Sequence, residues 1–332
     1  MKSIPLLILA LVLGDSRVHA NDDVPKTPEQ IKVYQDLQAA AYLCAPTIAQ
    51  YTAERQRAFA QQVLGGVDSR SLSADSLFAE GQYSDVTAST GEQKLLSCNP
   101  ARENQIRNST CVLAPEVEMG PYYEQAETTI RSNIAEYELG LLFLLNIGVI
   151  DVETCKPVPN VLVDIWHANA TGYPRVTGSR KGLLTPFPKS VWGETFLRGA
   201  LPTDKNGVAA FTTIFPGFYN GRATHIHVKA HPEWETRPNN TFVSGRLAHI
   251  GQLFFEDKLN AQVDKLWPYN LNHWQRTRNW DDGLNIFWDS QIGGYQSVID
   301  THFLGGVLQQ GIIGYVTMTV NMSATQDNTW HT

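Results

Sequence analysis

The chain has 332 residues, enough for one large domain with an appendage or for two domains. Hydrophobic residues make up 42% of it and charged residues 18%, which excludes an intrinsically disordered chain and a long coiled coil. Lys and Arg number 26 against 33 Asp and Glu, a net charge of -7 that repels phosphate backbones. We therefore expect no binding to nucleic acid.

Residues 1–20 are typical of a secretory signal peptide. Lys2 supplies a positive start, residues 4–13 form an apolar run too short to span a bilayer, and Val18-His19-Ala20 has the small-x-small pattern of a cleavage site. A buried core helix could share the apolar run, but the polar residues 21–23 that follow favour export. We expect a secreted, extracellular mature protein with no membrane anchor.

Cysteine usage agrees with export, because none of the four cysteines forms a C-x-x-C pair of the kind that binds zinc. Three pairings are possible, and four free thiols are the alternative. We expect disulfides between Cys111 and Cys155 and between Cys44 and Cys98. Secretion would also make this a candidate glycoprotein, with sequons at Asn108, Asn169, Asn239 and Asn321.

The first structured element is predicted to be a long helix. Thr27 and Gln30 form a capping box around Pro28, and an apolar face at 3.6-residue spacing continues to about Val63. Residues 68–107 are rich in Ser, Asp, Gly and Asn without periodicity, so we expect a long connection there.

From about residue 113 the pattern changes to short β-type runs separated by turns. Strands are predicted at 141–152, 160–166, 208–214, 225–230, 249–255 and 312–320. Strands this numerous without alternating helices predict a mainly β protein, an antiparallel sandwich or barrel rather than a parallel α/β sheet, and of the two we expect an antiparallel β-sandwich. Residues 257–295 are irregular and should wrap the sandwich with loops and short helices. The expected organisation is a signal peptide at 1–20, a helical segment and linker at 21–110, and a catalytic β-sandwich domain at 111–325.

One strand carries a candidate metal site. His225 and His227 are two residues apart, so their side chains leave the same face of a strand and can share an ion. Tyr219 and Arg222 come just before them. A bound cation can deprotonate a phenol, and the resulting hard oxygen favours Fe(III). A second phenol, Tyr173, follows another predicted strand at a glycine turn.

In these motifs the chain resembles the intradiol ring-cleavage dioxygenases, the family of catechol 1,2-dioxygenases and protocatechuate 3,4-dioxygenases, and most of all their secreted fungal-type branch. The motifs follow one another in family order over about residues 113–257. They are Pro115-Glu-Val-Glu-Met-Gly-Pro-Tyr-Tyr123, Thr154-Cys-Lys-Pro-Val-Pro159, Asp164-Ile-Trp-His-Ala-Asn-Ala-Thr-Gly172, Thr195-Phe-Leu-Arg-Gly199, Phe215-Pro-Gly-Phe-Tyr-Asn-Gly-Arg-Ala-Thr-His-Ile-His227 and Gly251-Gln-Leu-Phe-Phe255.

The resemblance implies a non-haem Fe(III) centre and a site around it. The implied iron ligands are Tyr173, Tyr219, His225 and His227, although the stretch leading to Tyr173 is one residue shorter than the family pattern. Arg222 would stabilise anionic substrate character, Tyr219 would act as a base, and Gln252 and Tyr122 would line the substrate pocket.

The implied reaction joins O2 to a catechol and opens its ring between the two hydroxylated carbons, giving a cis,cis-muconate-type diacid. It requires no organic cofactor. The choice among catechol, methylcatechols, protocatechuate, hydroxyquinol and larger polyphenols stays open, and we expect a monomer.

Two other functions compete with this one. The chain could be a secreted β-sandwich binding module without iron chemistry that holds aromatic or carbohydrate ligands through Trp192, Trp234 and Trp267. It could instead be a copper or zinc enzyme in which His231 joins the two strand histidines. That second alternative leaves both tyrosines and the arginine without a role.

Overall fold

The N-terminal helix is the first element of the computed structural model, which describes residues 27–63, 123, 128–173, 195–292 and 297–326. Helix α1 spans Pro28–Val63, which confirms the predicted helix. The expected signal peptide and the connection at 68–107 lie outside the described residues. No helix in the described part of the chain combines the length and apolar character needed to cross a membrane.

The first sheet has five strands. Its order is β10-β11-β1-β2, with β5 also paired to β1. The strands are β1 (Leu142–Asp151), β2 (Lys156–Pro157), β5 (Val208–Ile214), β10 (Asp300–Phe303) and β11 (Ile312–Val320). All its pairs are antiparallel except that of β1 with β11. That parallel pair joins strands far apart in the chain, as parallel pairing requires a long crossover.

The second sheet has four antiparallel strands in the order β4-β3-β6-β9 and carries the candidate site. They are β3 (Leu162–Trp166), β4 (Arg198–Pro202), β6 (His225–His231) and β9 (His249–Phe254). A separate hairpin pairs β7 (Glu233–Thr236) with β8 (Phe242–Arg246). The chain is therefore mainly β, as predicted.

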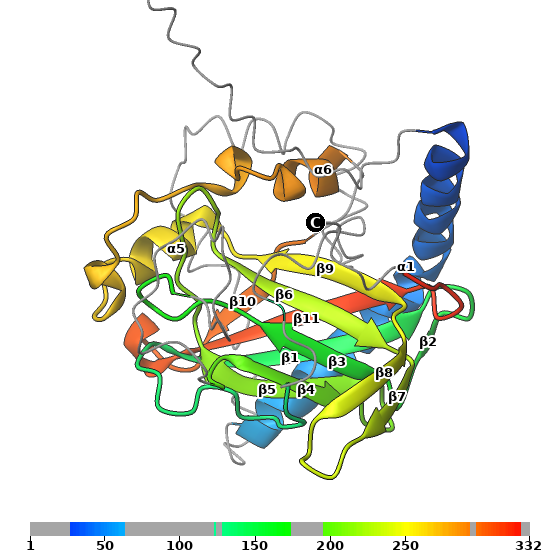
Figure 1. Cartoon of the computed structure of the whole chain (residues 1–332), viewed down its shortest axis with the longest axis horizontal. Helices are drawn as coiled ribbons and strands as arrows, with labels where there is room; N and C mark the ends of the chain where they lie inside the picture. The colour runs from blue at the N-terminus through cyan, green and yellow to red at the C-terminus, as the bar shows by residue number, and fades with distance from the viewer. Residues whose placement is uncertain (1–26, 64–122, 124–127, 174–194, 293–296, 327–332) are drawn as a thin grey trace, which may run out of the picture.

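Short helices occupy much of residues 257–292, as expected for the segment 257–295, whose last three residues lie outside the described part of the chain. These are α5 (Asp257–Val263), η4 (Tyr269–Leu271), η5 (Asn279–Asp281) and α6 (Ile286–Ile292), and η6 (Leu308–Gln310) precedes the last strand. Figure 1 shows α6 above β9 and α5 at the left of the view, with α1 passing behind the sheets.

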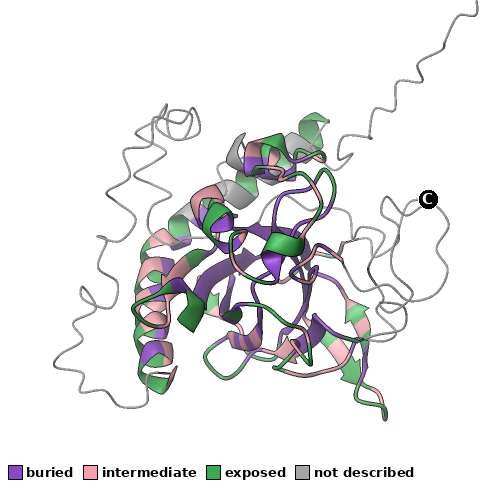
Figure 2. Ribbon diagram, turned by 90° about the vertical axis from the view of Figure 1, so that its left-hand side faces the viewer, coloured by how far each residue is buried: buried purple, intermediate pink, exposed green. Residues whose placement is uncertain are grey.

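The two sheets pack face to face over one hydrophobic core, which makes the sandwich. Strands β1, β3, β6, β9 and β11 are buried almost throughout, whereas α1 exposes one side (Figure 2). Alternate residues of each strand enter the core, as the two-residue period of a strand requires. In the two central strands these are Phe143, Leu145, Ile147 and Val149 of β1 and Ile226, Val228 and Ala230 of β6.

Helix α1 covers the other face of the five-stranded sheet. Arg55 is its anchor, because the buried guanidinium donates to the Asn146 and Val316 carbonyls and to the Thr317 hydroxyl. Gly148 allows the close approach, since a Cβ there would come within 2.7 Å of the Tyr51 ring. Burial lowers the pKa of Arg55 only to about 10, so the anchor stays charged at neutral pH.

The expected pairings of Cys44 with Cys98 and of Cys111 with Cys155 were wrong. Cys44 of α1 pairs with Cys155, which follows β1, across 111 residues. The pairing depends on where α1 docks, because Cys44 packs with Ile48 and Ile150 in a small cluster between helix and sheet. Spacing along the chain cannot report that contact. Cys98 and Cys111 lie outside the described residues.

His167 joins the two sheets at the end of β3. One of its ring nitrogens lies 2.8 Å from the Thr213 hydroxyl on β5 and the other 2.8 Å from the Ala168 carbonyl. Burial lowers the pKa of His167 to about 4, so the ring is neutral in the folded protein at pH 7.

We predict that His167 makes the protein acid-sensitive. As pH falls from about 6.5 toward about 4, the unfolded chain gains a proton that the folded chain does not, so up to about 3 kcal/mol of unfolding free energy is lost. His167→Gln should flatten this slope in urea titrations between pH 7 and pH 4. The control is His302→Gln, a partly exposed histidine. An unchanged slope in His167→Gln would contradict the assignment.

Candidate metal centre

The alternation of β6 places the predicted histidines together. His225 and His227 are each 4% exposed and lie on the outer face of the four-stranded sheet, opposite the core residues Ile226 and Val228. β6 is an inner strand, hydrogen-bonded to β3 on one side and β9 on the other. Both imidazoles therefore project from a strand that β3 and β9 hold in place on its two sides.

Tyr219, the predicted phenol ligand, lies beside the two histidines. Its phenol oxygen lies 3.0 Å from His225 Nε2, and that nitrogen lies 3.1 Å from His227 Nε2. Imidazole nitrogens bind metal ions at about 2.1 Å, and two such ligand atoms at right angles are about 3 Å apart. The spacing of these three atoms thus fits neighbouring ligands of one cation.

The protonation states of His225 and His227 also suit metal ligands. His225 Nδ1 lies 2.7 Å from the Ala223 carbonyl, which can only accept, so Nδ1 carries the proton and Nε2 keeps its lone pair. Burial first and then the charge of Arg222 lower the pKa of His225 well below its usual value. Burial and the neighbouring His225 do the same for His227. Two neutral imidazoles and a phenol are a donor set suited to a ferric ion.

The loop that carries Tyr173 packs directly on the loop that leads to Tyr219. Asn169 organises it, because its side-chain oxygen accepts from the Tyr173 N–H at 3.0 Å and its backbone carbonyl accepts from the Gly217 N–H at 3.2 Å. Gly172 has a φ of 85°, and a Cβ there would overlap the Phe218 carbonyl oxygen. Glycine at this position is therefore what lets the two tyrosine loops meet.

The Tyr173 side chain itself is half-buried. It packs against the sandwich core, with its ring centroid 6.0 Å from that of His273. The structure brings its backbone next to the Tyr219 loop, and its place as an iron ligand stays a prediction. Tyr122, expected in the substrate pocket, lies outside the described residues.

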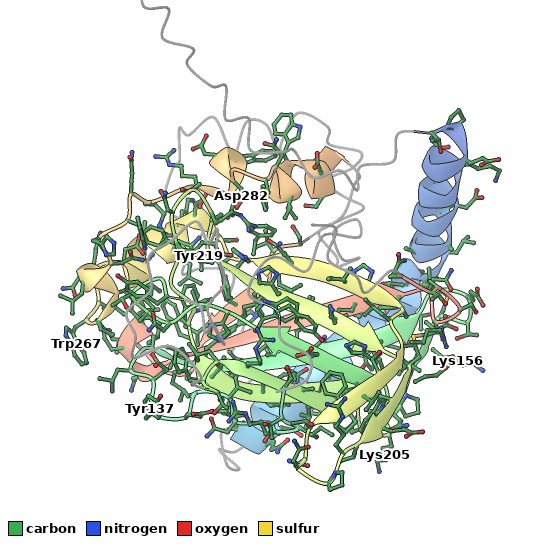
Figure 3. All side chains as sticks on the ribbon, viewed as in Figure 1. Tyr137, Lys156, Lys205, Tyr219, Trp267 and Asp282 are labelled. Carbon is green, nitrogen blue, oxygen red and sulfur yellow. A yellow bond between two sulfur atoms is a disulfide. The ribbon has the colours of Figure 1, made fainter. Side chains whose placement is uncertain are left out.

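Arg222 and Gln252 also meet, on the β9 side of the site. Arg222 Nη2 donates to the Gln252 side-chain oxygen at 2.5 Å, and Gln252 is opposite His227 in the β6–β9 register. A buried carboxylate that the sequence motifs do not include, Asp282, accepts from Arg222 Nε at 3.0 Å. Figure 3 labels Asp282 and Tyr219 on the same side of the molecule, above the four-stranded sheet.

A stack of aromatic rings borders His227. The Trp166 indole lies parallel to the His227 ring, with centroids 4.6 Å apart and an interplanar angle of 3°. Its centroid is 4.7 Å from that of Tyr123, and Lys229 Nζ sits 3.5 Å from the centre of the Tyr123 ring. In the described part of the chain His227 Nδ1 has no hydrogen-bond partner, so the indole and the contact of Nε2 with His225 orient this ring.

Buried charges surround this stack, which the sequence analysis did not anticipate. Asp164 faces Lys229 across the β3–β6 pair, and Arg198 lies over Trp166. Burial raises the pKa of Asp164 and lowers that of Lys229, while each charge counteracts the shift of the other. The sequence did contain a signal, since Asp164 and Lys229, of opposite charge, lie within two of the predicted strands, 160–166 and 225–230.

The three-histidine site is not assembled in the described residues, and Trp192 of the other alternative lies outside them. His231 lies at the far end of β6, next to the Ser244 hydroxyl at 2.7 Å, and within the described residues no three His, Cys, Asp or Glu side chains gather into a metal-binding group. Trp234 donates to the Asn160 carbonyl from the β7–β8 hairpin, on the opposite side of the view from exposed Trp267 (Figures 1 and 3).

Comparison with known proteins agrees with this geometry. The family model described as Dioxygenase matches residues 117–265. The crystal structure of an intradiol ring-cleavage dioxygenase from Tetranychus urticae shares 31% identity, with 65% of this chain and 98% of that chain covered and a TM-score of 0.53. A second dioxygenase crystal structure shares 30% identity over 65% and 98% of the two chains, with a TM-score of 0.52. No curated protein matches. The chain belongs to the intradiol ring-cleavage dioxygenases and is an enzyme of that family.

Proposed function

We propose that this enzyme is a secreted, Fe(III)-dependent dioxygenase that opens catecholic rings between their two hydroxylated carbons. The observation that carries the proposal is that the Tyr219 phenol oxygen and His227 Nε2 lie 3.0 Å and 3.1 Å from His225 Nε2 in a buried site. Both atoms of O2 enter the product, so catechol and O2 together account for the cis,cis-muconate-type diacid without a further reductant.

Tyr173, Tyr219, His225 and His227 would hold the iron. When bound, ferric iron withdraws electron density from a chelated catecholate and makes its ring reactive toward O2. Phenolate oxygens are hard ligands that favour Fe(III), whereas a site for copper or zinc would not need them.

The protein's own groups would handle protons and charge. The Tyr219 oxygen would act as a base after a bound cation had displaced its own proton, because a phenolate, unlike the phenol that here donates to His225 Nε2, can accept a proton from a substrate hydroxyl. Arg222 brings a fixed positive charge that stabilises negative charge developing on the substrate, and Gln252 holds one of its nitrogens. Burial of these residues keeps bulk water away and strengthens their electrostatic effect.

We predict that the purified protein consumes O2 with catechol and forms a muconate-type product, seen by ultraviolet absorption and by two oxygen atoms gained from labelled O2. Tyr219→Phe should lower kcat by about 10²-fold or more, because the proton acceptor is lost. Tyr137→Phe, a change at an exposed tyrosine, is the matched control. Full activity in Tyr219→Phe, or no product from the unaltered enzyme, would contradict the proposal.

Trp166 supplies a test of iron binding. Trp166→Leu should weaken iron affinity by about tenfold, because changes to groups that orient metal ligands cost about 10- to 100-fold. Trp166→Phe retains a flat ring and should lose less. Affinity is measured by competition with a chelator, and Trp267→Leu, at an indole that is 64% exposed, is the control. Equal affinities for Trp166→Leu and the control would overturn this role.

Secretion has support from the Cys44–Cys155 disulfide, which is typical of proteins that fold in an oxidising compartment. Among the sequons in the described residues, Asn239 is the most suitable for a glycan, because it is exposed at the turn between β7 and β8, whereas Asn169 and Asn321 are partly buried. Asn108 lies outside the described residues.

We predict that the protein expressed in a eukaryotic secretory host is recovered from the medium with Asn21 as its first residue. N-terminal sequencing checks the cleavage site, and Asn239→Gln should increase gel mobility if that site carries a glycan. Retention in the cell with Met1 intact would contradict secretion. The same material, run on a calibrated sizing column, tests the expected monomer.

A further inference from the structure

We propose that Asp282 is a positioning residue of the reaction, one that holds Arg222 and the backbone beside His225 in their working places. The inference rests on the proposed function of Arg222. Asp282 lies outside the residues 117–265 that match the family model, so a part of the chain beyond that model completes the family's site.

The contact between the two side chains is close and buried. Arg222 Nε lies 3.0 Å from both carboxylate oxygens of Asp282, and the exposed fractions of the two side chains are 7% and 0%. The side-chain oxygen of Gln252 accepts a hydrogen bond from Nη2 of the same guanidinium at 2.5 Å. Two partners from separate elements therefore set the plane of the guanidinium, and Asp282 is the charged one.

The same carboxylate reaches the ligand strand through Ala223. The Ala223 N–H donates to Asp282 Oδ2 at 2.8 Å, and the Ala223 carbonyl lies 2.7 Å from His225 Nδ1. Ala223 thus links the Asp282 carboxylate to Nδ1 of His225, a candidate iron ligand. Loss of Asp282 should displace Arg222, which it contacts directly, more than His225, which it reaches only through Ala223.

Asp282 is itself fixed in place. Its Oδ1 accepts from the Leu284 N–H at 3.2 Å, and the Gly283 N–H donates to the Gly221 carbonyl at 2.8 Å. Ile286 and Phe287, just beyond, pack against Ala223 and Phe254. The segment from 282 to 287 therefore packs both on the loop that carries Arg222 and on β9.

Three variants separate these roles. Asp282→Asn keeps an oxygen for the Ala223 N–H but removes the charge, so it should retain iron and lower kcat/KM for catechol by about 10- to 100-fold, the cost of a misplaced group. Asp282→Ala removes both contacts and should also weaken iron affinity. Asp281→Asn makes the same chemical change at the exposed neighbouring residue and should behave as the unaltered enzyme.

A double variant tests whether Asp282 acts through Arg222. In an Arg222→Met background, Asp282→Asn should cause less than a twofold further loss of kcat/KM, because the group that it positions is already gone. Iron content and the visible spectrum are measured for every variant, which separates positioning from unfolding. Independent, multiplicative losses, or an Asp282→Asn enzyme with unchanged kcat/KM, would overturn the inference. An unaltered enzyme that leaves catechol intact would instead refute the proposed function.

Discussion

The two-residue alternation of β6 is the constraint on which the site depends. One side of the strand supplies Ile226 and Val228 to the sandwich core, so the other side must present His225 and His227. A one-residue slip would bury the histidines in the core and expose the aliphatic residues. The hydrophobic packing that stabilises the sandwich therefore also fixes the direction of the candidate iron ligands.

The same alternation explains how much could be predicted from the sequence. Long β-branched runs such as those of β1 and β11 were recognised because they are buried on both faces, and α1 because its caps and periodicity agree. The strand β4, Arg-Gly-Ala-Leu-Pro, was missed, since its residues have weak β-propensity and its pairing with β3 defines it.

In the site, the structure brings together the predicted residues that are close in sequence. Tyr219, Arg222 and the two histidines lie within nine positions, so the local pattern contains most of the geometry. Asp282 and the Cys44–Cys155 pair depend on how distant segments dock, which no local pattern reports. The stack of Trp166 on His227 was only partly predictable. The motif contains Trp166, but the β3–β6 register is needed to show that it lies against His227.

The central claim is that these residues hold ferric iron through tyrosine oxygen, and a visible absorption spectrum with iron analysis tests it most directly. The purified full chain, reconstituted with iron, should contain about one iron per chain and show a broad tyrosinate-to-Fe(III) charge-transfer band that shifts on anaerobic addition of catechol. A colourless protein that stays iron-free after reconstitution would contradict the account.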